Sequence, residues 1–111
     1  MKKKAYQFYH DTYFQPFYFL PNWTREEIIL TFKYDPGDNA QGLTFILGDV
    51  IFIWIKKYSI KNLGYLCHES LHATNILFET RGQKISTKND EAQAYMIQWI
   101  FDSCRKCLNK K

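Results

Sequence analysis

The chain has 111 residues, 46% of them hydrophobic and 18% aromatic, which predicts one folded domain and excludes a disordered or collagen-like chain. No apolar run approaches the roughly 20 residues that a membrane-spanning helix needs. The formal net charge of +4 comes from five lysines at the two ends, because the rest of the chain holds ten basic and eleven acidic residues. We therefore expect no nucleic-acid partner, no membrane partner and no basic stripe that follows phosphates.

The basic start of the chain is not followed by the apolar segment of a signal peptide, so we expect a protein that stays in the cytoplasm. The cysteine content agrees, because three is an odd number and small secreted domains more often carry an even set. Cys104 and Cys107 have the spacing of a redox pair or of half a zinc site, but no second pair completes four ligands. We expect both to be ordinary helix residues.

The N-terminal half has the pattern of strands. Residues 5–20 hold eight aromatic side chains with prolines as breakers, which predicts one or two extended segments. Residues 28–34 alternate as a strand does, whereas Thr24 and Glu27 have the spacing of a capping box, so a strand and a short helical turn compete there. Residues 35–39 form a loop by their turn chemistry.

The clearest pairing is a hairpin of residues 43–47 with residues 50–55. Gly48 and Asp49 separate the two runs, and a glycine at the first central position suits a type II′ turn. Every residue of the second run is apolar, which predicts a strand that is covered on both faces.

The C-terminal half has the pattern of two helices. The first runs from Ser59 as its N-cap to Glu79 and stops at Gly82, and the second starts at Asn89 or Asp90. The sequence therefore predicts a single α+β domain over residues 1–111. A small antiparallel or mixed sheet from residues 5–58 would pack on helices at 59–81 and 89–107.

The first helix contains the motif His68-Glu69-Ser70-Leu71-His72. Residues four apart lie about 40° apart around a helix axis, so both imidazoles can reach one Zn²⁺ ion at roughly 2.0–2.1 Å per nitrogen. Glu69 lies about 100° round from His68, where a general base can take a proton from a water molecule at the metal. The alternative is an amphipathic helix whose polar face happens to hold two histidines and a glutamate.

A third metal ligand is expected because catalytic zinc usually has three protein ligands and a water molecule. Glu91 follows His72 by nineteen residues, and an antiparallel second helix would return it to the histidine pair. Asp90 is the neighbouring alternative. Both acids could instead stabilise the N-terminus of the second helix, where negative charge is favourable.

These residues resemble a known family. An H-E-x-x-H motif followed about twenty residues later by a glutamate on a helix is similar to the gluzincin group of zinc metallopeptidases. More narrowly, residues 42–103 resemble small metallopeptidases common in bacteriophage and prophage genomes, on the strength of segments 48–55, 67–73 and 89–95. The resemblance implies a minimal zincin-like domain in which His68, His72 and Glu91 hold Zn²⁺ and Glu69 is the catalytic base. For a phage-encoded protein, the compartment would be the host cytoplasm.

The resemblance also implies a substrate site. The strand Val50–Ile55 would lie beside the active-site helix, and Val50, Phe52 and Trp54 would belong to an edge that pairs with an extended peptide or protein substrate. Tyr95 stands where larger gluzincins carry an aspartate that orients the first histidine. Tyr95, His10 or an N-terminal tyrosine is then a candidate donor to the oxyanion of the transition state.

Two functions follow from these observations. The first is a zinc-dependent peptide hydrolase, in which Glu69 activates the water that attacks a zinc-polarised carbonyl. The alternative is a non-catalytic binding or inhibitor module of phage type, with a structural or vestigial zinc site and the aromatic N-terminal segment as its contact surface. The aromatic content and the two-sided apolar strand are also consistent with a homodimer.

Overall fold

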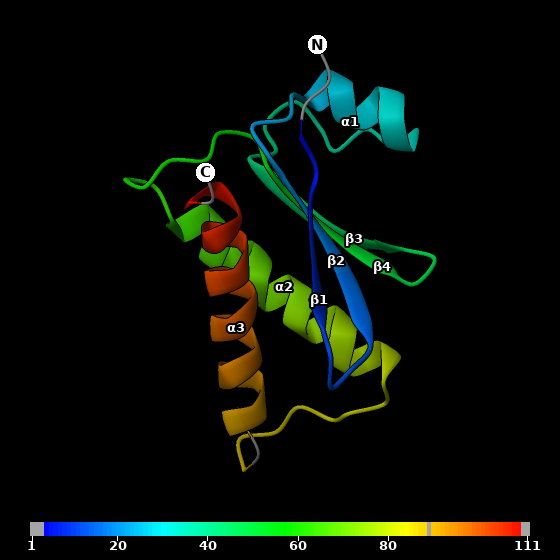
Figure 1. The fold of residues 1–111 in the computed structure, drawn as a ribbon. Helices are drawn as coiled ribbons and strands as arrows, with labels where there is room; N and C mark the ends of the chain where they lie inside the picture. The colour runs from blue at the N-terminus through cyan, green and yellow to red at the C-terminus, as the bar shows by residue number, and fades with distance from the viewer. Residues whose placement is uncertain (1–3, 89, 110–111) are drawn as a thin grey trace.

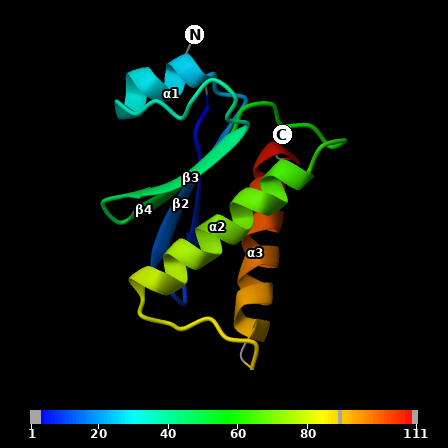
Figure 2. The same ribbon diagram turned by 180° about the vertical axis from the view of Figure 1, so that it is seen from behind.

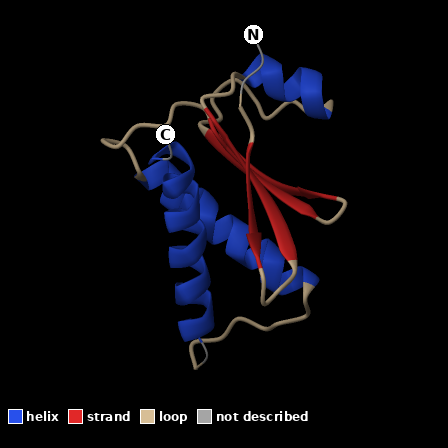
Figure 3. Cartoon of the chain, in the orientation of Figure 1, coloured by secondary structure: helices blue, strands red, loops and turns tan. Residues whose placement is uncertain are grey.

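The computed structural model describes residues 4–88 and 90–109, so four of the five terminal lysines lie outside the described residues. Its fold is α+β, as the sequence predicts (Figure 1). The strands form one mixed sheet in the N-terminal half, and two long helices make up the C-terminal half (Figure 3). The elements in chain order are β1 (Tyr6–His10), β2 (Gln15–Pro21), α1 (Arg25–Phe32), β3 (Gly42–Leu47), β4 (Val50–Ile55), α2 (Gly64–Thr80) and α3 (Asp90–Asn109).

The sheet has the strand order β1-β2-β4-β3. The outer pairs, β1 with β2 and β3 with β4, are antiparallel, whereas β2 and β4 in the centre are parallel. The hairpin of β3 and β4 is confirmed, with Leu47 opposite Val50 and Gly48 at a φ of 62°. A positive φ at the first central position is what a type II′ turn requires.

β4 is an interior strand, so the prediction that it offers an edge to substrate is wrong. Its residues pair with β2 on one side and with β3 on the other. Val50, Phe52 and Trp54 therefore have no free strand edge, and Trp54 is completely buried. The free edge near α2 belongs to β3, which pairs with β4 alone in the part of the chain that the structure describes.

The period of two along the central strands divides the core into two clusters. One face of β2 and β4 packs against α2 and α3, and the other packs against α1. Figure 2 shows α2 running diagonally across the sheet with α3 beside it, and α1 near one end of the sheet. The α2 side contains Phe17, Phe19, Ile51, Ile53 and Ile55, and the α1 side contains Leu20, Ile28 and Trp54.

Residues 25–32 form a helix, so the capping box predicts this segment correctly and the strand pattern over 28–34 does not. The Glu27 backbone N–H donates to Thr24 Oγ1 at 3.1 Å, and the Thr24 backbone N–H donates to Glu27 Oε1 at 2.7 Å. The helix forms in place of a strand because the two side chains accept hydrogen bonds from backbone N–H groups that the first turn leaves unpaired. The apparent alternation has no common face: Ile28 is buried and Leu30 is 71% exposed.

The first long helix starts later than predicted. Ser59 is not its N-cap, because α2 begins at Gly64 and Leu63 holds the cap position without a side-chain hydrogen bond. Ser59 Oγ instead accepts a hydrogen bond from the Lys61 backbone N–H at 3.1 Å, within a turn that precedes the helix. α2 ends at Thr80, and Gly82 follows it with a φ of 70°. α3 starts at Asp90, and Asn89 lies outside the described residues.

The aromatic N-terminal segment packs partly inside the molecule, whereas Phe14 is 75% exposed and Tyr9 is 46% exposed. Phe17 and Phe19 are fully buried, and the rings of Phe8 and Phe17 stack with centroids 4.9 Å apart. Trp99 of α3 covers this stack, with its centroid 5.6 Å from that of Phe8. Packing of the sheet therefore accounts for the buried and half-buried rings of this segment and leaves Phe14 and Tyr9 at the surface. None of the helices in residues 4–88 and 90–109 combines the length and the apolar character of a membrane span.

Candidate functional site

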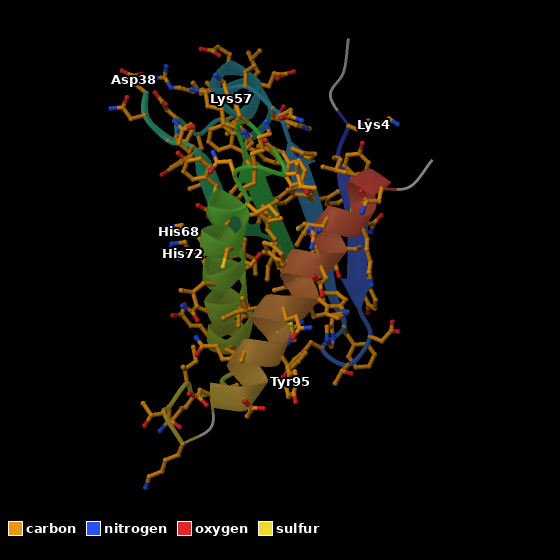
Figure 4. The ribbon with its side chains drawn as sticks, turned by 90° about the vertical axis from the view of Figure 1, so that its left-hand side faces the viewer. Lys4, Asp38, Lys57, His68, His72 and Tyr95 are labelled. Atoms are coloured by element: carbon orange, nitrogen blue, oxygen red, sulfur yellow. The ribbon has the colours of Figure 1, made fainter. Side chains whose placement is uncertain are left out.

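The two histidines of the motif meet on the exposed side of α2. His68 Nε2 and His72 Nε2 lie 3.1 Å apart, and the two rings are nearly perpendicular. Both side chains project from the same side of the helix (Figure 4). Two nitrogens that each bind a tetrahedral zinc ion at 2.0–2.1 Å are about 3.3 Å apart. The distance between the two nitrogens is close to that between two ligands of one zinc ion, and it is also the distance of a hydrogen bond between the two rings.

Glu69 turns from the histidines toward the sheet and is held there by β3. Its residue is 7% exposed, and the Thr44 hydroxyl donates to Glu69 Oε1 at 2.7 Å and lies 3.1 Å from the Glu69 carbonyl oxygen. A buried carboxylate needs such partners, because burial without them is costly. The hydrogen bond fixes one carboxylate oxygen against the edge strand and leaves Oε2 without an assigned partner among the described contacts.

Gly42 makes the close approach of β3 to Glu69 geometrically possible. A Cβ at this position would lie 2.8 Å from the Trp54 carbonyl oxygen, 3.2 Å from Glu69 Cγ and 3.3 Å from Glu69 Oε2. The missing side chain therefore lets the backbone of β3 pack closely against the Glu69 side chain. The backbone oxygen of Trp54 cannot move aside without disturbing the pairing of β3 with β4.

We expect Gly42→Ala to lower the free energy of unfolding by about 1–3 kcal/mol, the usual cost of forcing atoms into a packed site. Urea denaturation followed by circular dichroism measures this change. Gly64→Ala is the matched control, because a Cβ on Gly64 meets nothing within 4 Å, and we expect it to be neutral or stabilising in a helix. Equal stability of Gly42→Ala and the wild type would contradict the close approach.

The motif lies in a groove between β3 and α2. One cavity of about 460 Å³ contains all three motif side chains, and a second of about 540 Å³ adjoins it at Gly42, His68 and Glu69. The first is lined by Gly42, Leu43, Thr44, His68, Glu69, His72, Asn75, Ile76 and Glu79, and the second adds Gln41, Asn62, Gly64 and Tyr65. His68 and Glu69 therefore stand where the two cavities meet, with space along the groove in both directions.

Glu91 is not brought to the histidines. In the described residues, no group of three or more His, Cys, Asp or Glu side chains is placed so that it could hold a metal ion. The reason is the direction in which Glu91 projects from the helix. Glu91 lies five residues before the buried Met96, and this spacing places Glu91 about 140° round the helix axis from the face that packs in the core. Gln93 reaches α2 instead, and its amide donates to Asn75 Oδ1 at 2.9 Å.

Tyr95 and His10 also lie away from the motif, so the structure does not support either as the oxyanion donor. Tyr95 is 67% exposed and lines, together with His10, a separate cavity between α3 and the end of β1. Figure 4 shows Tyr95 on α3, far along the molecule from the two labelled histidines. A phenol that does line the groove is Tyr65, three residues before His68 on the same helix.

The cysteines behave as the sequence predicts. Cys104 and Cys107 are buried in the core between α3 and the sheet. Burial raises the pKa of the Cys104 thiol well above its usual range, and the nearby Cys107 acts in the same direction. Cys104 therefore stays protonated at neutral pH and lacks the thiolate that a metal ligand or a redox nucleophile needs.

Several residues of the groove cannot be found from the motif alone. Thr44 and Gly42 come from a strand more than twenty residues before Glu69, and only the folded sheet brings them together. Tyr65 is the exception, because its spacing of three from His68 places it on a neighbouring helix position that the sequence already shows.

No protein-family model, curated protein or solved structure matches this chain. What the site can do is therefore inferred from its own residues and their geometry.

Proposed function

We propose that the chain is a zinc-dependent peptide hydrolase, in which His68 and His72 hold the metal and Glu69 is the general base. The main support is the convergence of the two Nε2 atoms, 3.1 Å apart, in a groove that also contains the Glu69 carboxylate. Zinc bound there would supply a Lewis acid that polarises the substrate carbonyl.

The activation of the attacking water depends on residues of the chain itself. Glu69 Oε1 accepts a hydrogen bond from the Thr44 hydroxyl, so in this proposal Oε2 is the oxygen that takes the proton from the attacking water. Glu69 lines the cavity of about 460 Å³ between β3 and α2, which has room for that water molecule. The fixed position of the carboxylate spares the entropy cost of orienting it for each turnover.

The substrate in this proposal is an extended peptide that adds to β3 as a further strand. β3 is the first candidate because its outer edge is unpaired in the described part of the chain and borders the groove. Backbone groups at a free edge can bind another chain through the hydrogen bonds of a sheet, whatever its side chains. This replaces β4 with β3 as the strand that receives substrate.

We propose Glu91 as the third ligand. This role requires a movement of the helix that carries it. Glu79 lines the same cavity, but it lies seven residues, or about 10 Å of helix, beyond His72. Glu91 and Gln93 both stand in the first turn of α3, which is tied beside the groove by the hydrogen bond from Gln93 to Asn75. Glu91 reaches the histidines only if this first turn shifts when zinc binds.

Metal content tests the proposal. Elemental mass spectrometry on protein purified without a histidine tag should find one zinc per chain, and His68→Ala/His72→Ala should lose it. We expect Glu91→Gln to weaken zinc affinity by tenfold or more, since even residues that only support a ligand contribute about 10- to 100-fold. Glu79→Gln is the matched control and should bind zinc as the wild type does.

Each outcome bears on a different part of the proposal. A wild-type protein that takes up no zinc, even when zinc is added, would overturn the metal site. Zinc bound equally well by Glu91→Gln and the wild type would overturn Glu91 as a ligand and leave the two histidines in place.

A further inference from the structure

A second groove borders β3 on the face of the sheet opposite the histidines. It has a volume of about 470 Å³ and lies between α1 and β3. We call it the α1–β3 groove, and its apolar lining consists of Ile28, Phe32, Tyr34, Leu43, Phe45 and Leu47. The same strand therefore has a polar groove on one side and an apolar groove on the other.

The alternation of side chains along β3 explains this arrangement. The hydroxyl of Thr44 points to the α2 side, where it contacts Glu69. The ring of Phe45 points to the α1 side and meets the ring of Phe32 edge-on, with centroids 5.0 Å apart. Leu43 and Thr44 line both grooves, so only the width of one strand separates them.

The α1–β3 groove is open at the hairpin end. Leu47 is 58% exposed and Tyr34 is 56% exposed, although both have large side chains that line it. The adjacent outer edge of β3 is unpaired in residues 4–88 and 90–109. An unpaired edge next to exposed apolar side chains is a template for a further strand.

We propose that the α1–β3 groove is a substrate subsite that takes a bulky apolar side chain of the peptide paired with β3. The proposal rests on the proposed function, in which that peptide crosses the histidine groove. Because successive side chains of a strand point to opposite faces, the neighbour of a residue over the histidines points toward α1. The substrate class is therefore an extended peptide with bulky apolar residues at every second position and small or polar residues between them.

Two labelled peptides of identical composition test this alternation. Fluorescein-labelled KLSFSLK alternates apolar and polar residues, and KLLFSSK gathers its apolar residues in one run. Binding is measured by fluorescence anisotropy on zinc-loaded Glu69→Gln protein, which keeps the groove and lacks the general base. We expect KLSFSLK to bind about tenfold more tightly than KLLFSSK. Equal affinity of the two peptides would overturn the proposal.

A matched pair of variants locates the binding. Leu47→Ser removes an exposed apolar side chain inside the α1–β3 groove, and Leu30→Ser removes one from α1 outside it. We expect Leu47→Ser to weaken KLSFSLK binding about fivefold or more and Leu30→Ser to leave it unchanged, because only Leu47 would contact the peptide. Equal effects of the two changes would contradict the subsite. Matching thermal unfolding curves verify that both variants fold.

The same set of measurements separates this inference from the proposed function. If the wild type binds no zinc and cleaves neither peptide, but KLSFSLK binding still depends on Leu47, the α1–β3 groove is a peptide-binding site and the hydrolase proposal fails. Cleavage of both peptides at equal rates would support the hydrolase proposal and contradict the subsite. Sedimentation that shows a wild-type dimer and a Leu47→Ser monomer would mean that a second copy of the chain occupies the groove, and would overturn the inference.

Discussion

Replacing Glu69 with Gln is expected to lower the rate of peptide hydrolysis by about 10²- to 10⁴-fold, the usual contribution of a positioned general base. Gln keeps the shape of the side chain, and its carbonyl oxygen can still accept the Thr44 hydroxyl hydrogen bond seen at Oε1. The second position becomes an amide nitrogen that cannot take a proton. Zinc content should remain at the wild-type level, because the imidazoles of His68 and His72 are untouched.

The measurement is the rate of cleavage of a quenched fluorescent peptide mixture by zinc-loaded protein, with zinc content determined on the same samples. Glu79→Gln is the control, because it removes a carboxylate from the same cavity without touching the motif. We expect this control to retain wild-type activity. A Glu69→Gln variant as active as the wild type would exclude Glu69 as the base, whatever metal is bound.

Two local signals in the sequence predict the local structure correctly, whereas Ser59 as the N-cap of the first long helix does not. The glycine of the β3–β4 hairpin and the reciprocal pair Thr24 and Glu27 act over a few residues, and the structure contains both features. Where two local signals compete, the one that satisfies backbone hydrogen bonds prevails. The alternating pattern over 28–34 satisfies none, and Leu30 points to solvent.

The misplaced edge strand follows from pairing over a long distance. The parallel pairing of β2 with β4 joins residues more than thirty apart and leaves no local pattern, so the sequence could not place β4 in the centre directly. An indirect sign was present in the apolar character of both faces of β4. A strand covered on both faces is more often an interior strand, as β4 is, than a substrate edge.

The phase of α3 limits what can be predicted about the third ligand. Counting nineteen residues from His72 to Glu91 places the glutamate near the right turn of the second helix, but it ignores which way the side chain points. The buried positions Met96, Ile100 and Cys104 recur at a spacing of four, and this stripe fixes the face that packs in the core. Glu91 does not fall on that stripe. The spacing of the apolar residues in the sequence is enough to show this.

Removing the indole of Trp54 is expected to destabilise the fold by about 3–5 kcal/mol, the range for truncating a large buried aromatic side chain to Ala. Trp54 is completely buried in the cluster with Leu20 and Ile28, and its indole N–H donates to the Trp23 carbonyl oxygen at 2.7 Å. Small domains have a total stability of about 5–15 kcal/mol, so Trp54→Ala would lose a large part of it. Urea denaturation followed by circular dichroism gives the size of the loss.

Two further variants identify the cause. Trp54→Phe keeps most of the ring volume and loses the hydrogen bond, so we expect a smaller loss of about 1–2 kcal/mol. Leu30→Ala truncates a side chain that is 71% exposed and should change the stability by less than about 0.5 kcal/mol. A Trp54→Ala protein with wild-type stability and a raised KM would instead mean that Trp54 contacts substrate. That result would contradict the buried position of the Trp54 side chain.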